Sequence, residues 1–470
     1  MGSHVLFDIV KTYDVRGLVE SEVTPLITRA LGAAFVDVIS LPGSEIVVGY
    51  DMRESSPLLA DAFMEGVLSQ GGSVRNIGLS STDMVYFASG SWDLPAVMFT
   101  ASHNPATYNG LKFSRAKAQG ISLNTGLSDI RDRAIEYLEG TRVFDDVGGS
   151  IQESDVLADY ARYVRQLVPL TGERPLRIVV DAANGMAGHT VPAVLGDALG
   201  LAAAGIDIVP LYFQLDGTFP NHEANPLDPR NLVDLKAAVL AEGADLGLAF
   251  DGDADRCFVI DETGHSVTPS TVAALVSKRE IARVKESGEK GPIHVLHNLL
   301  CSRGVAEVIE EMGAIPLRTR VGHSLIKDQM RQSGAVFGGE HSAHYYFRDF
   351  WGADNGMLAA LHVIAELRAA SRPLSELTQH FSRYAESGEI NSSVESQEVV
   401  MSRLLEHFSD RGVLDELDGA TIMGETEGAW WWFNVRGSNT EPLLRLNVEG
   451  QTTESMERMR DEVLALIREG

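Results

Sequence analysis

The feature that most constrains the fold is a pattern of three strand-like runs that occurs three times along the chain. The first copy opens with SEIVVGYDMRESS (Ser44–Ser56), the second with LRIVVDAANGMAG (Leu176–Gly188) and the third with PIHVLHNLLCSRG (Pro292–Gly304). In each copy helical patterns separate short apolar runs, which favours βαβ units and a largely parallel sheet. Three related α/β domains are therefore expected.

The third strand of every copy ends in an unusually polar segment: FTASHNP, FDGDADR and GGEHSAH. Ligand-binding loops in α/β folds lie at the carboxyl ends of the strands. The three polar loops are therefore expected to face one shared cleft.

The end of the chain follows a different pattern. WWWFNVRGSNTEPLLRLNVEG alternates on both sides of a turn-like middle, which predicts a hairpin. One face of its second strand would carry Leu444, Leu446 and Val448, and the other Arg445, Asn447 and Glu449. The final segment predicts a helix whose apolar face is formed by Met456, Met459, Val463, Leu466 and Ile467. The expected domains are three α/β domains over 1–150, 151–266 and 267–384, and a smaller α+β domain over 385–470.

Charge and cysteine content exclude several classes of protein. A formal net charge of −27 argues against general nucleic-acid or anionic-membrane binding, which requires extended basic surface. A small anionic substrate remains compatible if the basic residues gather in one cleft. The two cysteines, Cys257 and Cys301, predict no disulfide framework and fit the reducing cytoplasm. No apolar run approaches the ~20 residues of a membrane span, and the start lacks the apolar core of a signal peptide.

The DGDADR segment places Asp251, Asp253 and Asp255 at alternate positions after an apolar strand. In an extended segment alternate side chains lie on one side, and three carboxylates there repel one another unless a cation lies among them. A hard divalent ion with oxygen ligands, Mg²⁺ before Ca²⁺, is the expected occupant. Arg256 could hold a phosphate near that ion or neutralise its neighbours.

Two other interpretations of the aspartates compete with a Mg²⁺ site. A calcium-binding EF-hand is disfavoured because Arg256 stands where that loop needs glycine, and because a strand precedes the segment instead of a helix. A solvated acidic turn is the simpler alternative.

The RGSNTEP segment combines a guanidinium with hydroxyl and amide groups, which together can bind phosphate oxygens. Its candidate residues are Arg436, Ser438, Asn439 and Thr440. An ordinary hairpin turn is the alternative, because the same residue types are common in turns.

In GGEHSAH, Glu340, Ser342 and His344 suit the hydroxyl groups of a ligand such as a sugar, although the trio could also occupy a surface loop. Weaker signals come from RVGHSLIK and KTYDVRG, where structural roles are more common than functional ones. These two segments contribute the candidates Arg320, His323, Lys327, Tyr13 and Arg16.

FTASHNPATYNGLKF offers a reactive serine. Ser102 follows a strand and lacks the G-x-S-x-G elbow of a hydrolase, so a protease-like triad is disfavoured. A serine beside a divalent ion and phosphate-binding arginines suggests a phosphoryl carrier, with the ion withdrawing charge during transfer. Lys112 is then available as an acid, a base or a local positive charge, while His103 is expected to support the loop.

The motifs T-A-S-H-N-P, D-G-D-A-D-R, G-H-S, G-E-x-S-x-H and R-x-S-N-T, in this order, resemble those of the α-D-phosphohexomutase superfamily. They are most similar to its phosphomannomutase/phosphoglucomutase branch, from Tyr13 to Thr440. The resemblance implies four domains around a deep cleft and an isomerase that interconverts hexose 1-phosphate and hexose 6-phosphate through a 1,6-bisphosphate. It also implies Mg²⁺, hexose 1,6-bisphosphate as activator, a hexose phosphate of mannose or glucose as the only expected class of partner, and a monomer or homodimer.

The resemblance also implies roles for individual residues. Ser102 would carry the phosphate and share Mg²⁺ with the three aspartates. Five further residues would surround the reacting phosphoryl group: Tyr13, Arg16, His103, Lys112 and Arg256. His323 would lie in the loop that selects the sugar, Glu340 and Ser342 would bind sugar hydroxyls, and His344 would lie near the substrate. The fixed phosphate site would comprise Arg436, Ser438, Asn439 and Thr440.

Two residues depart from the pattern of the family. Leu300 stands where many members have a lysine, so one phosphate contact is missing or is supplied by another residue such as Lys327. Ala343 replaces a common glycine in the sugar loop. Three alternatives remain open: a phosphoglucosamine mutase, a metal-dependent sugar phosphatase and a non-catalytic sugar-phosphate binding protein.

Overall fold

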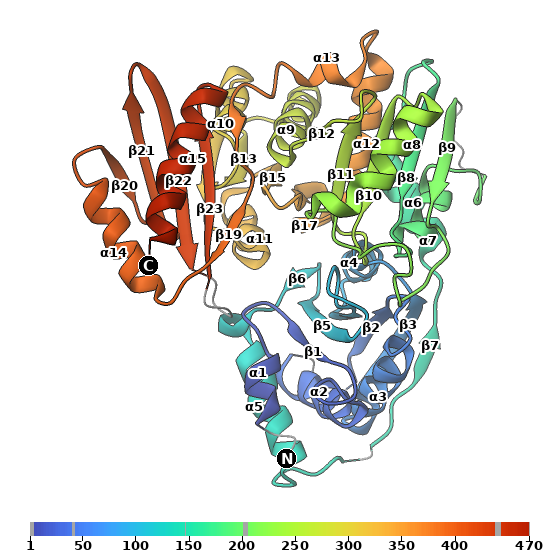
Figure 1. Cartoon of the computed structure of the whole chain (residues 1–470). Coiled ribbons are helices and arrows are strands. Elements are labelled where there is room, and N and C mark those ends of the chain that lie inside the picture. Colours follow the sequence, from blue (N-terminus) through green and yellow to red (C-terminus); the bar gives the residue numbers. More distant parts are fainter. Residues whose placement is uncertain (1–3, 40–42, 146, 201–204, 438–442, 470) are drawn as a thin grey trace. The chain divides into compact units, whose positions relative to one another are not determined.

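The computed structural model describes residues 4–39, 43–145, 147–200, 205–437 and 443–469. By their contacts the residues group into two compact units. The first unit contains residues 1–267, 327–337 and 342–377, and the second contains residues 268–326, 338–341 and 378–470. The described part contains three mixed α/β domains and an antiparallel C-terminal domain, as the repeat predicts (Figure 1).

The first α/β domain contains a seven-stranded sheet in the order β1-β5-β4-β2-β3-β7, with β6 beside β5. Its strands are β1 (Val15–Leu18), β2 (Glu45–Tyr50), β3 (Ser73–Leu79), β4 (Ala96–Phe99), β5 (Tyr108–Arg115), β6 (Gln119–Gly120) and β7 (Ile151–Glu153). Its helices are α1 (Val5–Ile9), α2 (Pro25–Val38), α3 (Ser56–Ser69), α4 (Thr82–Trp92) and α5 (Leu127–Leu138).

The second α/β domain repeats this plan in a sheet of order β12-β11-β10-β8-β9. Its elements are α6 (Leu157–Leu167), β8 (Leu176–Asp181), α7 (Ala187–Val194), β9 (Ile206–Leu211), α8 (Val233–Glu242), β10 (Leu246–Phe250), β11 (Cys257–Asp261) and β12 (Ser266–Val267). All five residues of β10 are buried, so this strand reads as a continuous apolar run instead of alternating.

The third copy of the repeat is divided between the units. Its elements in chain order are α9 (Pro269–Glu286), β13 (His294–Asn298), α10 (Arg303–Glu311), β14 (Ile315–Thr319), α11 (His323–Ser333), β15 (Phe337–Gly339), β16 (Tyr345–Phe347), β17 (Ala353–Asp354), α12 (Gly356–Ala369) and α13 (Leu374–Thr378). Strand β13 pairs in parallel with β14 within the second unit, and β16 pairs antiparallel with β17 within the first.

In the first two copies the three strands of the repeat are parallel, but the strand after the polar loop returns in the opposite direction. Strand β2 is parallel to β3 and β4, whereas β5 pairs antiparallel with β4. Likewise β8 is parallel to β9 and β10, and β11 is antiparallel to β10. The prediction of a largely parallel sheet is therefore incomplete, because a short loop between adjacent strands reverses the chain.

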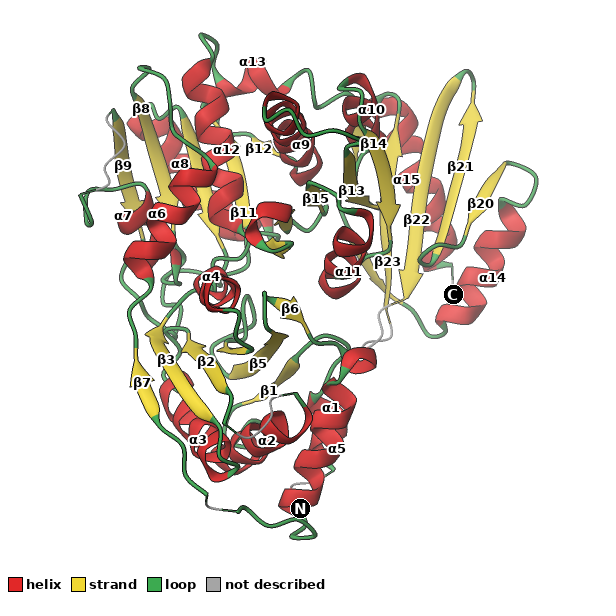
Figure 2. Cartoon of the chain, turned by 180° about the vertical axis from the view of Figure 1, so that it is seen from behind, coloured by secondary structure: helices red, strands yellow, loops and turns green. Residues whose placement is uncertain are grey.

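The C-terminal domain is an antiparallel sheet in the order β18-β23-β22-β21-β20, with β19 also on β23. Its elements are β18 (Ala385–Glu386), β19 (Ile390–Ser393), α14 (Gln397–His407), β20 (Gly412–Asp415), β21 (Ala420–Thr426), β22 (Ala429–Gly437), β23 (Leu443–Gly450) and α15 (Thr453–Arg468). Helix α15 packs on β22 and β23 (Figure 2). The predicted hairpin and the predicted apolar face of the last helix are confirmed.

The opposite face of β23 is also buried. Asn447 and Glu449 are only 4% and 0% exposed. Glu449 is covered because its carboxylate accepts hydrogen bonds from Ser302 Oγ, from the backbone N–H of Arg303 and from the indole of Trp432. Alternation along the strand predicted the two faces, but the contacts that bury the polar face are distant in sequence.

Of the described helices, none is both long enough and apolar enough to cross a membrane.

Helices α2 and α3 lie side by side against the first sheet (Figures 1 and 2), and two glycines allow this close packing. A Cβ atom at Gly66 of α3 would lie 2.0 Å from the backbone oxygen of Arg29, and one at Gly32 of α2 would lie 2.1 Å from the backbone oxygen of Phe63. A backbone atom inside a helix cannot yield to such a contact as a flexible side chain could.

We expect Gly66→Ala to destabilise the protein by about 1–3 kcal/mol, because overpacking against the Arg29 carbonyl outweighs the higher helix propensity of alanine. The shift of the first transition in urea unfolding measures this loss. Glu65→Ala, at the exposed neighbouring position of α3, is the control and should change the midpoint little. Equal midpoints for the two variants would contradict the close packing.

Candidate active site

Ser102 lies in the loop that joins β4 to β5. Its backbone has φ 48°, in the left-handed region that L-residues rarely adopt. The Ser102 N–H donates to Thr100 Oγ1 at 2.8 Å, and its Oγ donates to Asp251 Oδ2 at 2.8 Å. One of these contacts lies within the loop, and the other holds the hydroxyl towards the aspartate loop of the second domain.

Asp251, Asp253 and Asp255 lie in the corresponding loop, between β10 and β11, and all three are at most 1% exposed. One carboxylate oxygen from each lies within 4.8 Å of the others. Burial, opposed by Arg256 and reinforced by the other two carboxylates, raises the pKa of Asp251 to about 7. The alternative of a solvated acidic turn is therefore excluded, because water does not surround these carboxylates.

Lys112 on β5 supplies positive charge to this cluster. Its Nζ lies 2.6 Å from Asp253 Oδ2 and 2.6 Å from Asp255 Oδ2. Burial alone would lower the pKa of Lys112, but the two carboxylates outweigh it and hold the pKa well above its ordinary value. Lys112 is thus a fixed ammonium group, and Thr82 Oγ1 also donates to Asp253 Oδ2.

The cluster fits a hard divalent cation. Asp253 Oδ1 and Asp255 Oδ1 are buried without a hydrogen-bond partner, which is costly for a carboxylate oxygen unless a cation binds it. All candidate ligand atoms are oxygens, the type that Mg²⁺ prefers. The second group of possible ligands, Asp255, His344 and Asp354, is less suited to Mg²⁺ because it replaces one carboxylate oxygen with an imidazole nitrogen.

Arg256 and His103 complete the surroundings of Ser102. The Arg256 guanidinium pairs with Asp251 at 2.9 Å and lies 2.6 Å from His103 Nδ1. Burial, reinforced by Arg256 and Arg16, holds the pKa of His103 well below its ordinary value. Because a guanidinium can only donate, His103 Nδ1 accepts this bond.

Arg16 on β1 binds the serine loop from another side. Its Nη1 donates to the backbone oxygen of Ala101 at 2.6 Å and to Asn104 Oδ1, and its Nη2 pairs with Asp14. Tyr13 lies half-buried in the turn before β1.

Part of the third polar loop also reaches this cluster. His344 forms an isolated backbone bridge with Arg256, and its Nδ1 lies 3.0 Å from Asp354 Oδ2 and 3.9 Å from Asp255 Oδ1. Ser342 is half-buried. Ala343 between them adopts φ 66°, a conformation that favours glycine. The alanine that replaces the common glycine of the family therefore strains the backbone of the loop.

Lys327 has a different environment from the one expected of a phosphate ligand. Its Nζ is 2.6 Å from Asp354 Oδ1, and the side chain is 1% exposed. The ammonium also lies 4.1 Å from the centre of the Tyr86 ring. Leu300 is buried as well. The placement of Lys327 gives no support to the idea that it replaces the lysine missing at Leu300.

The remaining candidates lie in the second unit. Glu340 is buried, and its Oε1 accepts bonds from Asn298 Nδ2 and the Gly322 N–H, both at 3.3 Å. Arg436 pairs with Glu389 at 2.8 Å. Arg320 is exposed after β14, and His323 is the first residue of α11. Ser438, Asn439 and Thr440 lie outside the described residues.

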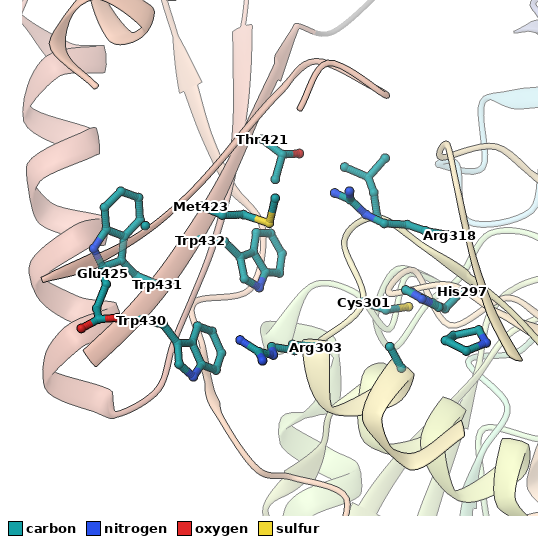
Figure 3. A pocket seen from close by; sticks show the side chains of 14 residues that line it. His297, Cys301, Arg303, Arg318, Thr421, Met423, Glu425, Trp430, Trp431 and Trp432 are labelled. Carbon is teal, nitrogen blue, oxygen red and sulfur yellow. The ribbon is translucent and has the colours of Figure 1, made fainter. Parts of the chain in front are cut away.

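A separate cavity of about 640 Å³ lies within the second unit (Figure 3). Trp430, Trp432 and Met423 line one side of it, and Arg303 and Arg318 lie opposite. A large apolar pocket is the default candidate for a ligand site. However, Arg303 pairs with Glu307 and Arg318 with Asp415, and none of its described lining residues is a predicted site residue. The chemistry therefore points to the cluster around Ser102.

Sequence patterns missed Arg53, Thr82 and Asp354, which bind the serine loop, Asp253 and His344 respectively. A signal was present for Arg53 because YDMR follows a buried strand, as the other polar loops do. No local signal marks Thr82 or Asp354, since their partners lie far along the chain.

We expect Lys112→Met to lower stability in the absence of divalent ions by about 3–5 kcal/mol, because two buried carboxylates lose their ammonium partner. Added Mg²⁺ should then raise the melting temperature more in this variant than in the wild type, since binding to the folded state stabilises it. Thermal unfolding with and without MgCl₂ measures both effects. Lys117→Met, at an exposed lysine, is the control; an absent Mg²⁺ shift in every protein would contradict the metal site.

The chain matches the four domains of one protein family in order. They are phosphoglucomutase/phosphomannomutase alpha/beta/alpha domain I over residues 8–137, domain II over 158–264, domain III over 268–384, and the C-terminal domain over 389–466.

Individual proteins are similar over almost their whole length. One named "Phosphohexose mutases", from Xanthomonas campestris, is 36% identical over 463 residues, which cover 97% of this chain and 98% of that protein. A phosphomannomutase/phosphoglucomutase of Pseudomonas aeruginosa is 33% identical over 460 residues, covering 96% and 94%. The crystal structure of a family protein from Burkholderia thailandensis superposes with a TM-score of 0.85 at 28% identity, covering 100% of this chain and 99% of the other.

These matches confirm the resemblance that the motifs indicate. With four domains matched over most of the sequence and relatives more than 30% identical along nearly all of it, the chain belongs to the phosphoglucomutase/phosphomannomutase family of isomerases.

Proposed function

We propose that the protein is a phosphohexomutase that interconverts the 1-phosphate and 6-phosphate of mannose, glucose or both. The observation that carries this proposal is the contact of Ser102 Oγ with Asp251, inside a buried cluster that also holds Asp253, Asp255 and Lys112. The names of the relatives support the substrate class.

Ser102 would act as a phosphoryl carrier. In the first transfer the bond from phosphorus to Ser102 Oγ breaks and a new bond forms to a hydroxyl oxygen of the sugar phosphate. The sugar hydroxyl gives up its proton, and Ser102 Oγ takes up a proton to become a hydroxyl again. The resulting 1,6-bisphosphate turns end for end, and the reverse transfer returns its other phosphoryl group to Ser102. The same intermediate, added in trace amounts, would load an unphosphorylated Ser102 and so act as the activator.

The surrounding residues would position this reaction. Asp251, Asp253 and Asp255, with an oxygen on Ser102, would hold Mg²⁺, which supplies charge stabilisation at the transferring group when bound. Lys112 and Arg256 present fixed positive charge to the same group. Positioning and electrostatics dominate phosphoryl transfer in general, which suits a cluster built of charges.

The other candidate residues would bind the rest of the substrate. Arg16 binds the serine loop, Tyr13 lies in the turn before β1, and His344 lies beside Asp255. Sugar hydroxyls would be bound by Glu340 and Ser342, with Arg320 and His323 contributing to the choice of sugar. The second phosphate would be bound by Arg436, Ser438, Asn439 and Thr440. Two nearly equivalent poses require such a non-covalent phosphate site.

Exclusion of water separates this function from a phosphatase. The same phosphoserine would release inorganic phosphate if water replaced the sugar hydroxyl. A phosphatase, however, needs neither a sugar-hydroxyl loop nor a second phosphate site.

We expect wild-type protein with Mg²⁺ and a trace of hexose 1,6-bisphosphate to isomerise mannose 1-phosphate or glucose 1-phosphate in a coupled assay. Ser102→Ala should lose at least about 10³-fold in rate, because the phosphoryl acceptor is removed. Ser114→Ala, at another buried serine of the same domain, is the matched control and should stay active.

Other results would favour the rival functions. Phosphate release without isomerisation would identify a phosphatase, and turnover of glucosamine 1-phosphate alone would identify a phosphoglucosamine mutase. Binding of hexose phosphates without any turnover would identify a non-catalytic sugar-phosphate binding protein.

A further inference from the structure

Arg53 is a buried arginine that the proposed mechanism does not use. It follows β2, in the turn before α3, and its side chain is 1% exposed. Burial of a guanidinium is costly unless its donors are well paired. The partners of Arg53 therefore indicate what the residue is for.

Those partners are backbone oxygens of the loop that carries Ser102. Arg53 Nη2 donates to the Ser102 oxygen at 2.9 Å and to the Asn104 oxygen at 2.7 Å. Its Nη1 donates to the Pro105 oxygen at 2.8 Å and to the Tyr108 oxygen at 3.0 Å. One planar guanidinium thus binds four carbonyl groups between Ser102 and the start of β5. A lysine ammonium has neither the reach nor the fork geometry for this pattern.

The guanidinium is itself held from two other directions. Its Nε lies 3.3 Å from Asp51 Oδ2, and its carbon lies 5.0 Å from the centre of the Phe219 ring. A Cβ atom at Gly217 would lie 2.6 Å from the Arg53 Cα. The second domain therefore packs directly against this arginine and leaves its side chain little freedom.

The backbone of Ser102 is enclosed between Arg53 and the aspartate loop. The Ser102 oxygen that accepts the Arg53 bond would lie 2.4 Å from a Cβ atom at Gly252, next to Asp251. Ser102 also has a left-handed backbone, which is unfavourable for a residue other than glycine and persists only where the surroundings hold it. The bonds from Arg53 supply such a hold at the reacting residue.

We propose that Arg53 is a positioning residue for phosphoryl transfer: by binding the four carbonyl groups it fixes the direction of Ser102 Oγ towards the substrate. This inference rests on the proposed function, because it assigns Arg53 a role in aiming the phosphoserine. A positioning role differs from a purely stabilising role in one respect. Loss of Arg53 should change the division of the phosphoryl group between the sugar and water, as well as the rate of transfer.

The test is Arg53→Lys, which keeps the positive charge but removes the two guanidinium nitrogens that bind the four carbonyl oxygens. Two rates are measured under the coupled-assay conditions with Mg²⁺ and hexose 1,6-bisphosphate: sugar isomerised and inorganic phosphate released. We expect isomerisation to fall about 10²-fold, as expected for a misplacement of about 1 Å. Phosphate released per sugar isomerised should rise several-fold, because water that breaks the bond to Ser102 Oγ needs less exact orientation than a bound sugar hydroxyl.

Arg75→Lys is the matched control. Arg75 belongs to the same domain, pairs with Glu45 at 2.9 Å and lies 4.9 Å from the centre of the Trp92 ring, but it does not contact the serine loop. Phe219→Leu is the second variant: it removes the ring beside the guanidinium and leaves the four hydrogen-bonding partners in place. It should change the ratio in the same direction by a smaller factor, and it keeps the test available should Arg53→Lys fail to fold.

The ratio of phosphate released to sugar isomerised decides the matter. A ratio equal to that of the wild type in Arg53→Lys and Phe219→Leu, with isomerisation reduced only in proportion to folded protein, would overturn the positioning role. An inactive wild type, or full activity of Ser102→Ala, would instead overturn the proposed function. The two failures are therefore distinguishable.

Discussion

The first unit depends on the neutralisation of three carboxylates that the fold removes from water. Asp251, Asp253 and Asp255 could not be buried together without positive partners, because desolvation and mutual repulsion both oppose their charged forms. Lys112 comes from the first domain and Arg256 from the aspartate loop itself. The charge balance therefore joins the first two domains, and the serine that the proposed chemistry needs lies where they meet.

The repeated fold explains how three different chemistries arise at corresponding positions. In the first two copies a buried parallel strand ends in a short loop, and an antiparallel strand then returns beside it. The strands fix the ends of each loop, so the residues inside can differ without loss of the sheet. One loop carries the serine, the second carries the carboxylates, and the third contributes His344 to the same cluster.

The sequence predicted those parts of the site that follow a strand directly, because strand patterns are local and the polar residues break them visibly. The positions of Ser102 and of the aspartates could be anticipated for this reason. Contacts between distant segments could not be: the partners of Arg53, and the burial of Lys327 against Asp354, depend on how separate elements pack. Glu449 shows the same limit, since alternation placed it on the polar face of β23 but gave no sign of the residues that cover that face.

Buried positive groups have two distinct tasks in this unit. Lys112 and Arg256 pair with side-chain carboxylates and set the charge of the cluster, whereas Arg53 binds mainly carbonyl oxygens and sets the shape of a loop. Carbonyl groups carry no net charge and do not titrate, so the acceptors of the Arg53 bonds stay the same throughout a reaction cycle. A loop shaped in this way can keep the same conformation while a phosphoryl group arrives and leaves. That independence is what a carrier residue requires, because its loop must be equally suited to two successive transfers in opposite directions.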